Sequence, residues 1–173
     1  VIYDADDNEV DKLHGEENRE YVKLSAITTN MQNAVIAIED QRFYEHNGID
    51  IQGIIRAGVN GVAHGFHFTE GASTLTQQLI KNNVFPNFIN ESKYQRIERK
   101  IQEQYLAVQV EKKTDKDTIL ENYLNTINLG AGSYGVQAAA RQYFDKDVWD
   151  LNLSECATLA GITQNPTKFN PII

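Results

Sequence analysis

The residues with the clearest chemical potential begin at Glu39 and Asp40, which follow the helically spaced apolar residues Val35 and Ile38. A carboxylate at the C-terminal end of a buried helix face is unfavourable as an anion, because burial and the helix dipole both oppose its charge. Such a group is suited to general acid or base catalysis. Taken alone, the pattern also fits a capping residue or a surface ion pair with Arg42.

A second cluster lies between Gly71 and Lys81, where small and hydroxyl residues precede a predicted helix. Backbone N–H groups and hydroxyls at the start of a helix can bind an anionic group such as a phosphate. The polar residues of this cluster are Ser73, Thr74, Gln77, Gln78 and Lys81. The alternative is an ordinary serine N-cap with solvated amides.

A third cluster places Arg96, Arg99, Lys100 and Glu103 within about two turns of one predicted helix. Arg99 and Glu103 are four residues apart and share a face, so a carboxylate lies beside several cations. In isolation this pattern favours helix-surface ion pairing, worth roughly 0.3–0.5 kcal/mol per pair. A fourth segment, residues 119–144, is rich in apolar and small residues and predicts mainly packing.

Composition and charge argue against several classes of protein. The net charge of −8 argues against nucleic acid as a partner, because a phosphate backbone needs a basic surface. Cys156 is the only cysteine in this sequence, so it cannot form an internal disulfide, and we expect it to be a buried structural thiol. The four histidines show no metal-ligand spacing, and no apolar run approaches the roughly 20 residues that span a bilayer.

The elements that must position these clusters follow from the periodicity of apolar residues, which predicts a mainly α-helical fold. We expect β-structure only in residues 1–24, with residues 21–24 as a returning strand. Residues 82–94 lack a clear period and predict a loop with apolar tips, which either folds over the core or touches a membrane or gates a substrate. The expected helices cover about residues 30–40, 50–65, 96–112, 136–143 and 154–162, and two more begin after Ser73 and after a capping box at residues 114–117.

Together the clusters extend into longer motifs, in a fixed order, over nearly the whole chain. They are Glu39-Asp-x-Arg-Phe43-x-x-His46-x-Gly-Ile-Asp50, Gly71-Ala-Ser-Thr-Leu-Thr-Gln-Gln-Leu-Ile-Lys81, Arg99-Lys-x-x-Glu103, Ile119-Leu-x-x-Tyr-Leu-Asn125, Gly135-Val-Gln-Ala-Ala-Ala140 with Tyr143-Phe144, and Leu153-x-x-x-Ala157-x-Leu-Ala-Gly161-x-x-Gln-x-Pro166. In this combination the sequence resembles glycosyltransferase family 51. These peptidoglycan glycosyltransferases are the polymerase domains of class A penicillin-binding proteins and the monofunctional transglycosylases.

The resemblance implies a lysozyme-like helical fold with a small membrane-associated subdomain and a short N-terminal β element. It implies a single domain over residues 1–173, excised from a longer membrane-anchored protein. Residues 1–24 would form the β element. About residues 55–95 would contain the membrane-associated subdomain and a mobile loop.

The resemblance also implies the reaction. The substrate would be lipid II, and a growing glycan strand would be transferred to its sugar hydroxyl with inversion, releasing undecaprenyl pyrophosphate. Glu39 matches the catalytic base of the family, and Glu103 matches its second essential carboxylate, which would assist the leaving group or organise the cations. The residues implied to bind substrate are Asp40, Phe43, Arg56, Ser73, Thr74, Gln77, Gln78, Lys81, Arg99 and Lys100.

Two rival functions remain open on the residues. The first is a lysozyme-like enzyme that cuts glycan, which would not need the cations at Lys81, Arg99 and Lys100. The second is a catalytically inactive module that binds lipid II or glycan. No cofactor is required by the reaction, although a divalent cation, Mg or Mn, is compatible with pyrophosphate chemistry. The implied partners are lipid II, the glycan strand, the membrane surface, a C-terminal transpeptidase domain and the cell-wall synthesis machinery, on the extracytoplasmic face of a bacterial cell membrane.

Overall fold

The computed structural model describes residues 2–3, 9–11, 18–63, 71–85 and 91–172, and within these ranges the fold is mainly α-helical, as expected. The helices are α1 (Thr29–Glu39), α2 (Ile51–Ala63), α3 (Leu75–Val84), α4 (Lys93–Glu111), α5 (Lys116–Thr126), α6 (Val136–Phe144) and α7 (Leu153–Ile162), with 3-10 turns η1 (Leu24–Ala26) and η3 (Val148–Asp150). None of the helices in these ranges is both long and apolar enough to cross a membrane.

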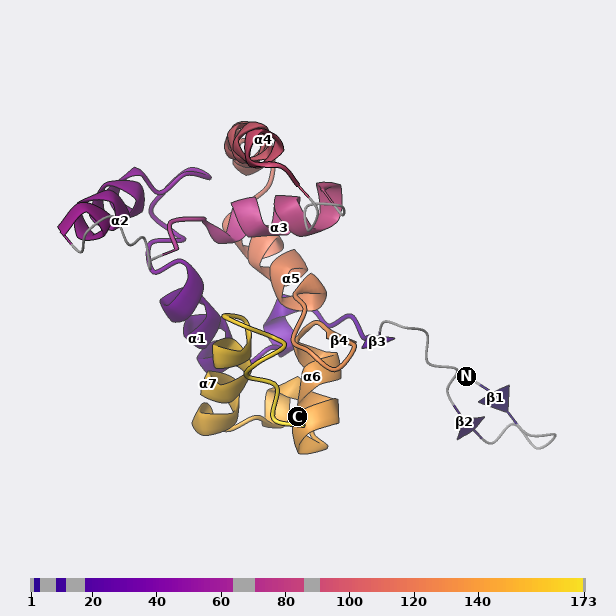
Figure 1. Ribbon diagram of the computed structural model, residues 1–173. Helices are drawn as coiled ribbons and strands as arrows, with labels where there is room; N and C mark the ends of the chain where they lie inside the picture. The colour runs from indigo at the N-terminus through magenta and orange to yellow at the C-terminus, as the bar shows by residue number, and fades with distance from the viewer. Residues whose placement is uncertain (1, 4–8, 12–17, 64–70, 86–90, 173) are drawn as a thin grey trace.

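The hydrophobic core lies between α1, α5, α6 and α7 (Figure 1). Helix α1 packs along α7, while α3 packs against both α5 and α4. The largest fully buried apolar side chains include Met31, Phe43, Leu75, Tyr123 and Leu159, which come from five different segments. The end of α1 and the start of α3 meet beside this core, where Asp40 accepts from the Leu75 N–H.

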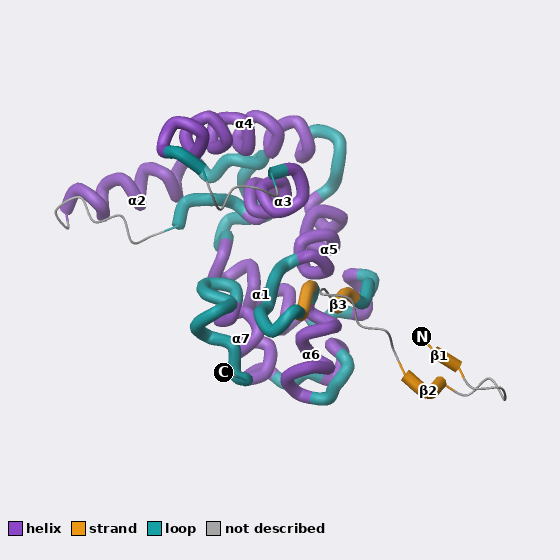
Figure 2. The backbone as a smooth tube through the Cα atoms, turned by 45° about the vertical axis from the view of Figure 1, so that its right-hand side comes forward, coloured by secondary structure: helices purple, strands orange, loops and turns teal. Residues whose placement is uncertain are grey.

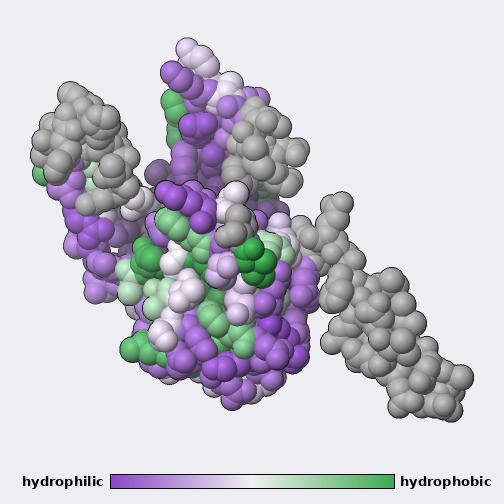
Figure 3. All heavy atoms as spheres, turned by 60° about the horizontal axis from the view of Figure 1, so that its bottom comes forward, coloured by the Kyte–Doolittle hydropathy of each residue, from purple (hydrophilic) through white to green (hydrophobic). Residues whose placement is uncertain are grey.

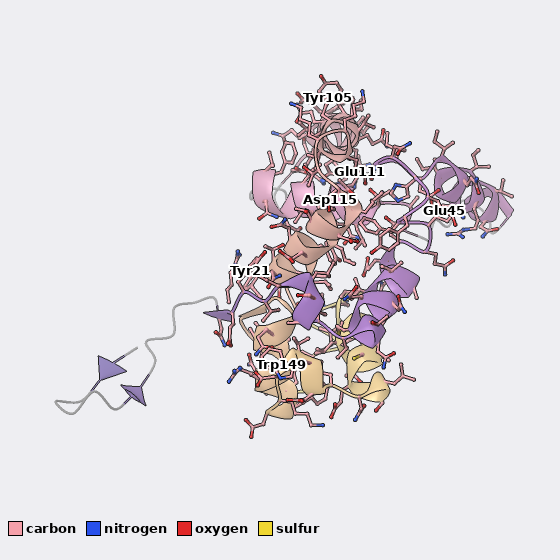
Figure 4. All side chains as sticks on the ribbon, turned by 180° about the vertical axis from the view of Figure 1, so that it is seen from behind. Tyr21, Glu45, Tyr105, Glu111, Asp115 and Trp149 are labelled. Carbon is pink, nitrogen blue, oxygen red and sulfur yellow. The ribbon has the colours of Figure 1, made fainter. Side chains whose placement is uncertain are left out.

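Helices α2 and α4 lie at the end of the molecule away from α6 and α7, in both views of the backbone (Figures 1 and 2). The space-filling view shows them as two projections separated by an open space (Figure 3). Tyr105 on α4 marks one end of the molecule and Trp149 on η3 the other (Figure 4). Several large apolar side chains on the two projecting helices are exposed, namely Ile51, Ile54, Ile55 and Val59 on α2 and Tyr94, Ile97, Ile101 and Tyr105 on α4.

Two short pairs of strands complete the described fold. Strands β1 (Ile2–Tyr3) and β2 (Glu9–Asp11) are antiparallel, while β3 (Asn18–Arg19) pairs in parallel with β4 (Ser133–Tyr134). The expected strand over residues 21–24 is wrong. A side chain replaces a partner strand there, because the Asn125 amide both donates to the Val22 carbonyl and accepts from the Val22 N–H, at 2.8 Å in each case.

Two of the predicted boundaries also need correction. Residues 82–94 are not one loop, since α3 continues to Val84 and α4 begins at Lys93 behind a capping box formed by Ser92 and Gln95. Residues 86–90 lie outside the described residues. The expected capping box at residues 114–117 is replaced by a single cap, in which the Asp115 side chain accepts from the Thr118 N–H.

Gly48 fixes how the segment after α1 lies on α4. Its φ is +93°, and a Cβ atom at this position would lie 2.6 Å from the carbonyl carbon of Ala107. Only glycine tolerates both the positive φ and this approach of two backbones. The Gly48 carbonyl in turn accepts hydrogen bonds from the Thr74 hydroxyl and the Gln77 amide, so this turn also supports the start of α3.

Candidate active site

Glu39 is the last residue of α1, and its carboxylate is held by donors from α3 and from the segment just beyond α7. Gln78 on α3 donates to Oε2 at 2.7 Å. Gln164, just beyond α7, donates to Oε1 at 2.8 Å, and the hydroxyl of Thr163 donates to the same oxygen. The half-buried carboxylate is therefore fixed in one orientation, although the two segments that donate to it are far from Glu39 in the sequence.

Asp40 anchors the adjacent turn. It is 6% exposed, and its Oδ2 accepts from the backbone N–H of Leu75 at 3.0 Å and lies 2.9 Å from His46 Nε2. Since His46 Nδ1 accepts from the Gly48 N–H, the Nε2 atom carries the proton that faces Asp40. The Asp40 carboxylate thus ties the end of α1 to the N-terminus of α3, where a negative charge is favourable.

A cavity of about 250 Å³ lies beside Glu39 and contains the cationic side chains of the site. Lys81 from α3 and Lys100 from α4 line it together with Ser73, Gln78 and Gln164. A smaller chamber of about 70 Å³ shares Ile38, Glu39, Gly71 and Ser73 with this cavity and extends to Asp40, Arg56 and Thr74. Glu39 therefore lies where the two chambers meet.

Glu103 is fully buried beneath the cations rather than exposed in the cleft. One of its oxygens binds the Arg99 guanidinium, and the other accepts from Lys100 Nζ at 2.8 Å. Lys100 Nζ also donates to the Ser73 hydroxyl at 3.1 Å, so Glu103 positions Lys100 at the cavity wall. Arg99 binds a second carboxylate, Glu91, at 2.7 Å.

The charges of these groups follow from their surroundings. Burial lowers the pKa of the Lys81 ammonium below its usual value, and the nearby Lys100 lowers it further. The pKa of Arg99 is raised, first by its hydrogen bond to Glu91 and also by Glu103. Arg99 is thus neutralised by two carboxylates, whereas the charge of Lys81 is disfavoured in the protein and would be stabilised by an anion in the cavity.

The structure brings together most of the residues expected to bind substrate but removes three from direct contact. Glu39, Asp40, Arg56, Ser73, Thr74, Gln78, Lys81 and Lys100 all line the two chambers. Phe43 is fully buried and Gln77 is 3% exposed, because one packs in the core and the other donates to the Gly48 carbonyl. Arg99 is 7% exposed and faces its two carboxylates, so it supports the site from below.

Sequence reasoning missed the direct partners of Glu39 beyond α7. Gln164 was part of the last motif and Thr163 an unspecified position within it, and neither had a role. The signals were the place of Gln164 in that motif and the position of both residues just after a predicted helix end. Cys156, by contrast, is buried as expected, with Sγ 3.6 Å from the Thr28 hydroxyl.

The carboxylates of the described residues do not fit a metal cage. No three His, Cys, Asp or Glu side chains in this part of the chain are grouped so that they could hold an ion. Both oxygens of Glu103 bind cationic side chains, and both oxygens of Glu39 accept hydrogen bonds. The oxygens of these two carboxylates are therefore occupied by protein donors and are not arranged to coordinate an ion.

Comparison with known proteins places the sequence in a family. The sequence matches the family described as Transglycosylase over residues 6–173. It is 48% identical to penicillin-binding protein 1A of Clostridium perfringens (strain 13 / Type A), over 98% of this chain and 25% of that protein. It is 44% identical to penicillin-binding protein 1A of Neisseria gonorrhoeae, over 100% of this chain and 21% of that protein. The chain thus spans a quarter or less of the length of these relatives.

Proposed function

The chain belongs to the transglycosylase family, the glycosyltransferases of peptidoglycan synthesis, and from this premise we propose that it polymerises lipid II into β-1,4-linked glycan strands. The observation that carries the proposal is the cavity in which the carboxylate of Glu39 faces the ammonium groups of Lys81 and Lys100. A base and a cationic pocket side by side suit a reaction in which a hydroxyl attacks and a pyrophosphate leaves.

Glu39 is the general base. A sugar hydroxyl is a weak nucleophile, so its proton must be taken as the new bond forms. The acceptor oxygen attacks the anomeric carbon of the donor strand, its proton passes to Glu39, and the pyrophosphate leaves with the electron pair of the broken bond. Because the donor linkage is α and the product linkage β, the configuration inverts.

Lys81 and Lys100 hold the leaving pyrophosphate. Its negative charge grows as the bond to the sugar breaks, and ammonium groups fixed in advance at the cavity wall stabilise that charge without rearranging. Ser73 and Gln78 add polar contacts along the same wall. Arg56 lines the smaller chamber and would contact the acceptor lipid II there. Any divalent cation that takes part would be carried mainly by the pyrophosphate.

Glu103 acts as the buried counter-charge of this pocket. With no exposed surface it does not reach the substrate, but it fixes Lys100 and Arg99 in place. In this role the second carboxylate organises the cations and does not protonate the leaving group. A lysozyme-like hydrolase would have no use for this arrangement, because no pyrophosphate leaves in its reaction.

We also propose that the projecting helices α2 and α4 contact the membrane that carries the lipid substrate. Their exposed apolar residues lie at the same end of the molecule, opposite α6 and α7 (Figure 1). Exposed apolar faces of this kind partition into the interface of a bilayer. Because the matching relatives are penicillin-binding proteins of four to five times this length, a transpeptidase domain in the same protein and an extracytoplasmic location fit the proposal.

The test is polymerisation of lipid II by purified protein, comparing the wild type with Glu39→Gln. The matched control is Glu45→Gln, an exposed carboxylate six residues away (Figure 4). We expect polymer from the wild type and the control, and none from Glu39→Gln. Polymer from all three would refute the role of Glu39 as base. Cleavage of preformed glycan without polymerisation would favour a hydrolase, and binding of lipid II without turnover would favour an inactive binding module.

A further inference from the structure

The segment after α7 contacts Glu39 through two side chains whose role in catalysis is open. Thr163 and Gln164 lie 124 and 125 residues from Glu39 in the sequence, and both donate to the same carboxylate oxygen, Oε1. Gln78 donates to the other oxygen, Oε2. The hydrogen bonds are therefore distributed unequally over the two oxygens of the base.

This unequal distribution decides which oxygen can accept a proton. A carboxylate has about four lone-pair positions, two on each oxygen. Among the described residues, Thr163 and Gln164 fill both positions on Oε1, whereas Gln78 alone donates to Oε2. One position on Oε2 remains for the hydroxyl of the incoming sugar.

Gln78 is itself held in the orientation that this arrangement needs. The hydroxyl of Tyr123 donates to the Gln78 carbonyl oxygen at 3.2 Å, which turns the amide nitrogen towards Glu39. Burial raises the pKa of Tyr123 well above its usual value, and the charges of Glu39 and Asp40 act in the same direction. The phenol therefore keeps its proton and remains a donor.

The hydroxyl of Thr163 has a second acceptor within reach. Its Oγ1 lies 2.7 Å from the carbonyl oxygen of Ala160, which also accepts from the Thr163 backbone N–H. A hydroxyl has one hydrogen, so it can donate to only one of the two acceptors at a time. Donation to Glu39 is favoured while that carboxylate is charged, because hydrogen bonds to an ionised group are the stronger ones. Once Glu39 has taken a proton, the hydroxyl can turn to Ala160.

We propose that Thr163 and Gln164 are positioning residues that occupy Oε1 of Glu39 and so direct the acceptor hydroxyl to Oε2. This inference rests on the proposed function, in which Glu39 is the general base. In the step it describes, the acceptor O–H proton passes to Oε2, the acceptor oxygen bonds to the anomeric carbon, and the pyrophosphate leaves with its electron pair. Thr163 releases its hydrogen bond to Oε1 as the charge on Glu39 is neutralised.

The experiment compares three variants of the purified protein in lipid II polymerisation. Thr163→Val removes the hydroxyl but keeps the shape of the side chain, and Thr163→Ser restores the hydroxyl. Thr158→Val on α7 is the matched control, because Thr158 is exposed and its hydroxyl bonds only the carbonyl of Ser154, within the same helix. The readouts are kcat, KM for lipid II and the melting temperature of each variant.

We expect Thr163→Val to lower kcat by roughly tenfold, the scale of one hydrogen bond to a charged group, with KM within about twofold of the wild type. Thr163→Ser should recover most of kcat, and Thr158→Val should behave as wild type. An unchanged kcat in Thr163→Val would overturn the proposal, and so would an equal loss in Thr163→Ser, since the effect would then be packing. If Glu39→Gln polymerises normally, the role of Glu39 as base fails, and if the wild type makes no polymer, the proposed function itself fails.

Discussion

Replacement of the buried carboxylate Glu103 by glutamine should destabilise the protein substantially. The substitution keeps the size of the side chain but removes its charge and places an NH₂ group against one of two cations. Both Arg99 and Lys100 bind this carboxylate, which has no exposed surface. Removing one partner of a buried ion pair costs about 3–5 kcal/mol, because the remaining charge is left uncompensated.

The structure places the expected loss at the lower end of that range. Arg99 keeps its second partner, Glu91, at 2.7 Å, and the Lys100 side chain is 41% exposed, so water can solvate its ammonium. We therefore expect Glu103→Gln to lower the free energy of unfolding by about 3 kcal/mol. For a domain of this size, that loss corresponds to a fall in melting temperature of roughly 6–12 °C.

Urea unfolding followed by circular dichroism, together with thermal melting, measures this effect. The control is Glu98→Gln on the same helix, because Glu98 is exposed and accepts only a 3.5 Å contact from Gln102. It should change the free energy of unfolding by no more than about 0.5 kcal/mol. A loss below about 1 kcal/mol in Glu103→Gln would refute the reasoning, since Glu103 would then not be the counter-charge on which the pocket depends.

Three further changes test other parts of the structure. Gly48→Ala should lower the free energy of unfolding by about 3 kcal/mol or more, because a Cβ would collide with the α4 backbone and the φ of +93° is strained for alanine. An unchanged midpoint of urea unfolding would contradict this packing. As the pH is raised, polymerisation should begin to decline at a pH below 10.5, the ordinary pKa of lysine, because the lowered pKa of Lys81 means that its ammonium group loses its proton at a lower pH. In a pH profile of the rate, Lys81→Arg should keep its activity to higher pH, since the guanidinium stays charged. Asn125→Leu should lower the melting temperature by several degrees, because it breaks both hydrogen bonds to the Val22 backbone, and a melting temperature equal to wild type would mean that this clamp contributes little.

The sequence determined the helices because the signals that form them are local. Apolar spacing predicted α1, and the hydroxyl residues before Leu75 predicted the start of α3. Errors arose where two local signals competed or where a distant group intervened. A single Asp115 cap replaced the capping box expected at residues 114–117, and the Asn125 side chain took the place of a strand partner beside Val22.

Much of the candidate site was also readable from the sequence, because the motifs named Glu39, Lys81 and Lys100 before their proximity was known. What only the tertiary structure decided was which side chains face the cavity and which lie beneath it. Phe43 is buried in the core and Glu103 beneath the cations, although their motifs give no sign of it. Burial depends on how separate helices pack, which the spacing along one helix cannot specify.

The same reason applies to the surroundings of Glu39. Its position at the end of a helix follows from the sequence, but its three donors come from α3 and from the segment beyond α7. The spacing of 124 residues to Thr163 carries no geometric information, because the packing of α1 along α7 alone brings the two together. The sequence thus determined which carboxylate is present, and the tertiary structure decided which donors bind each of its oxygens.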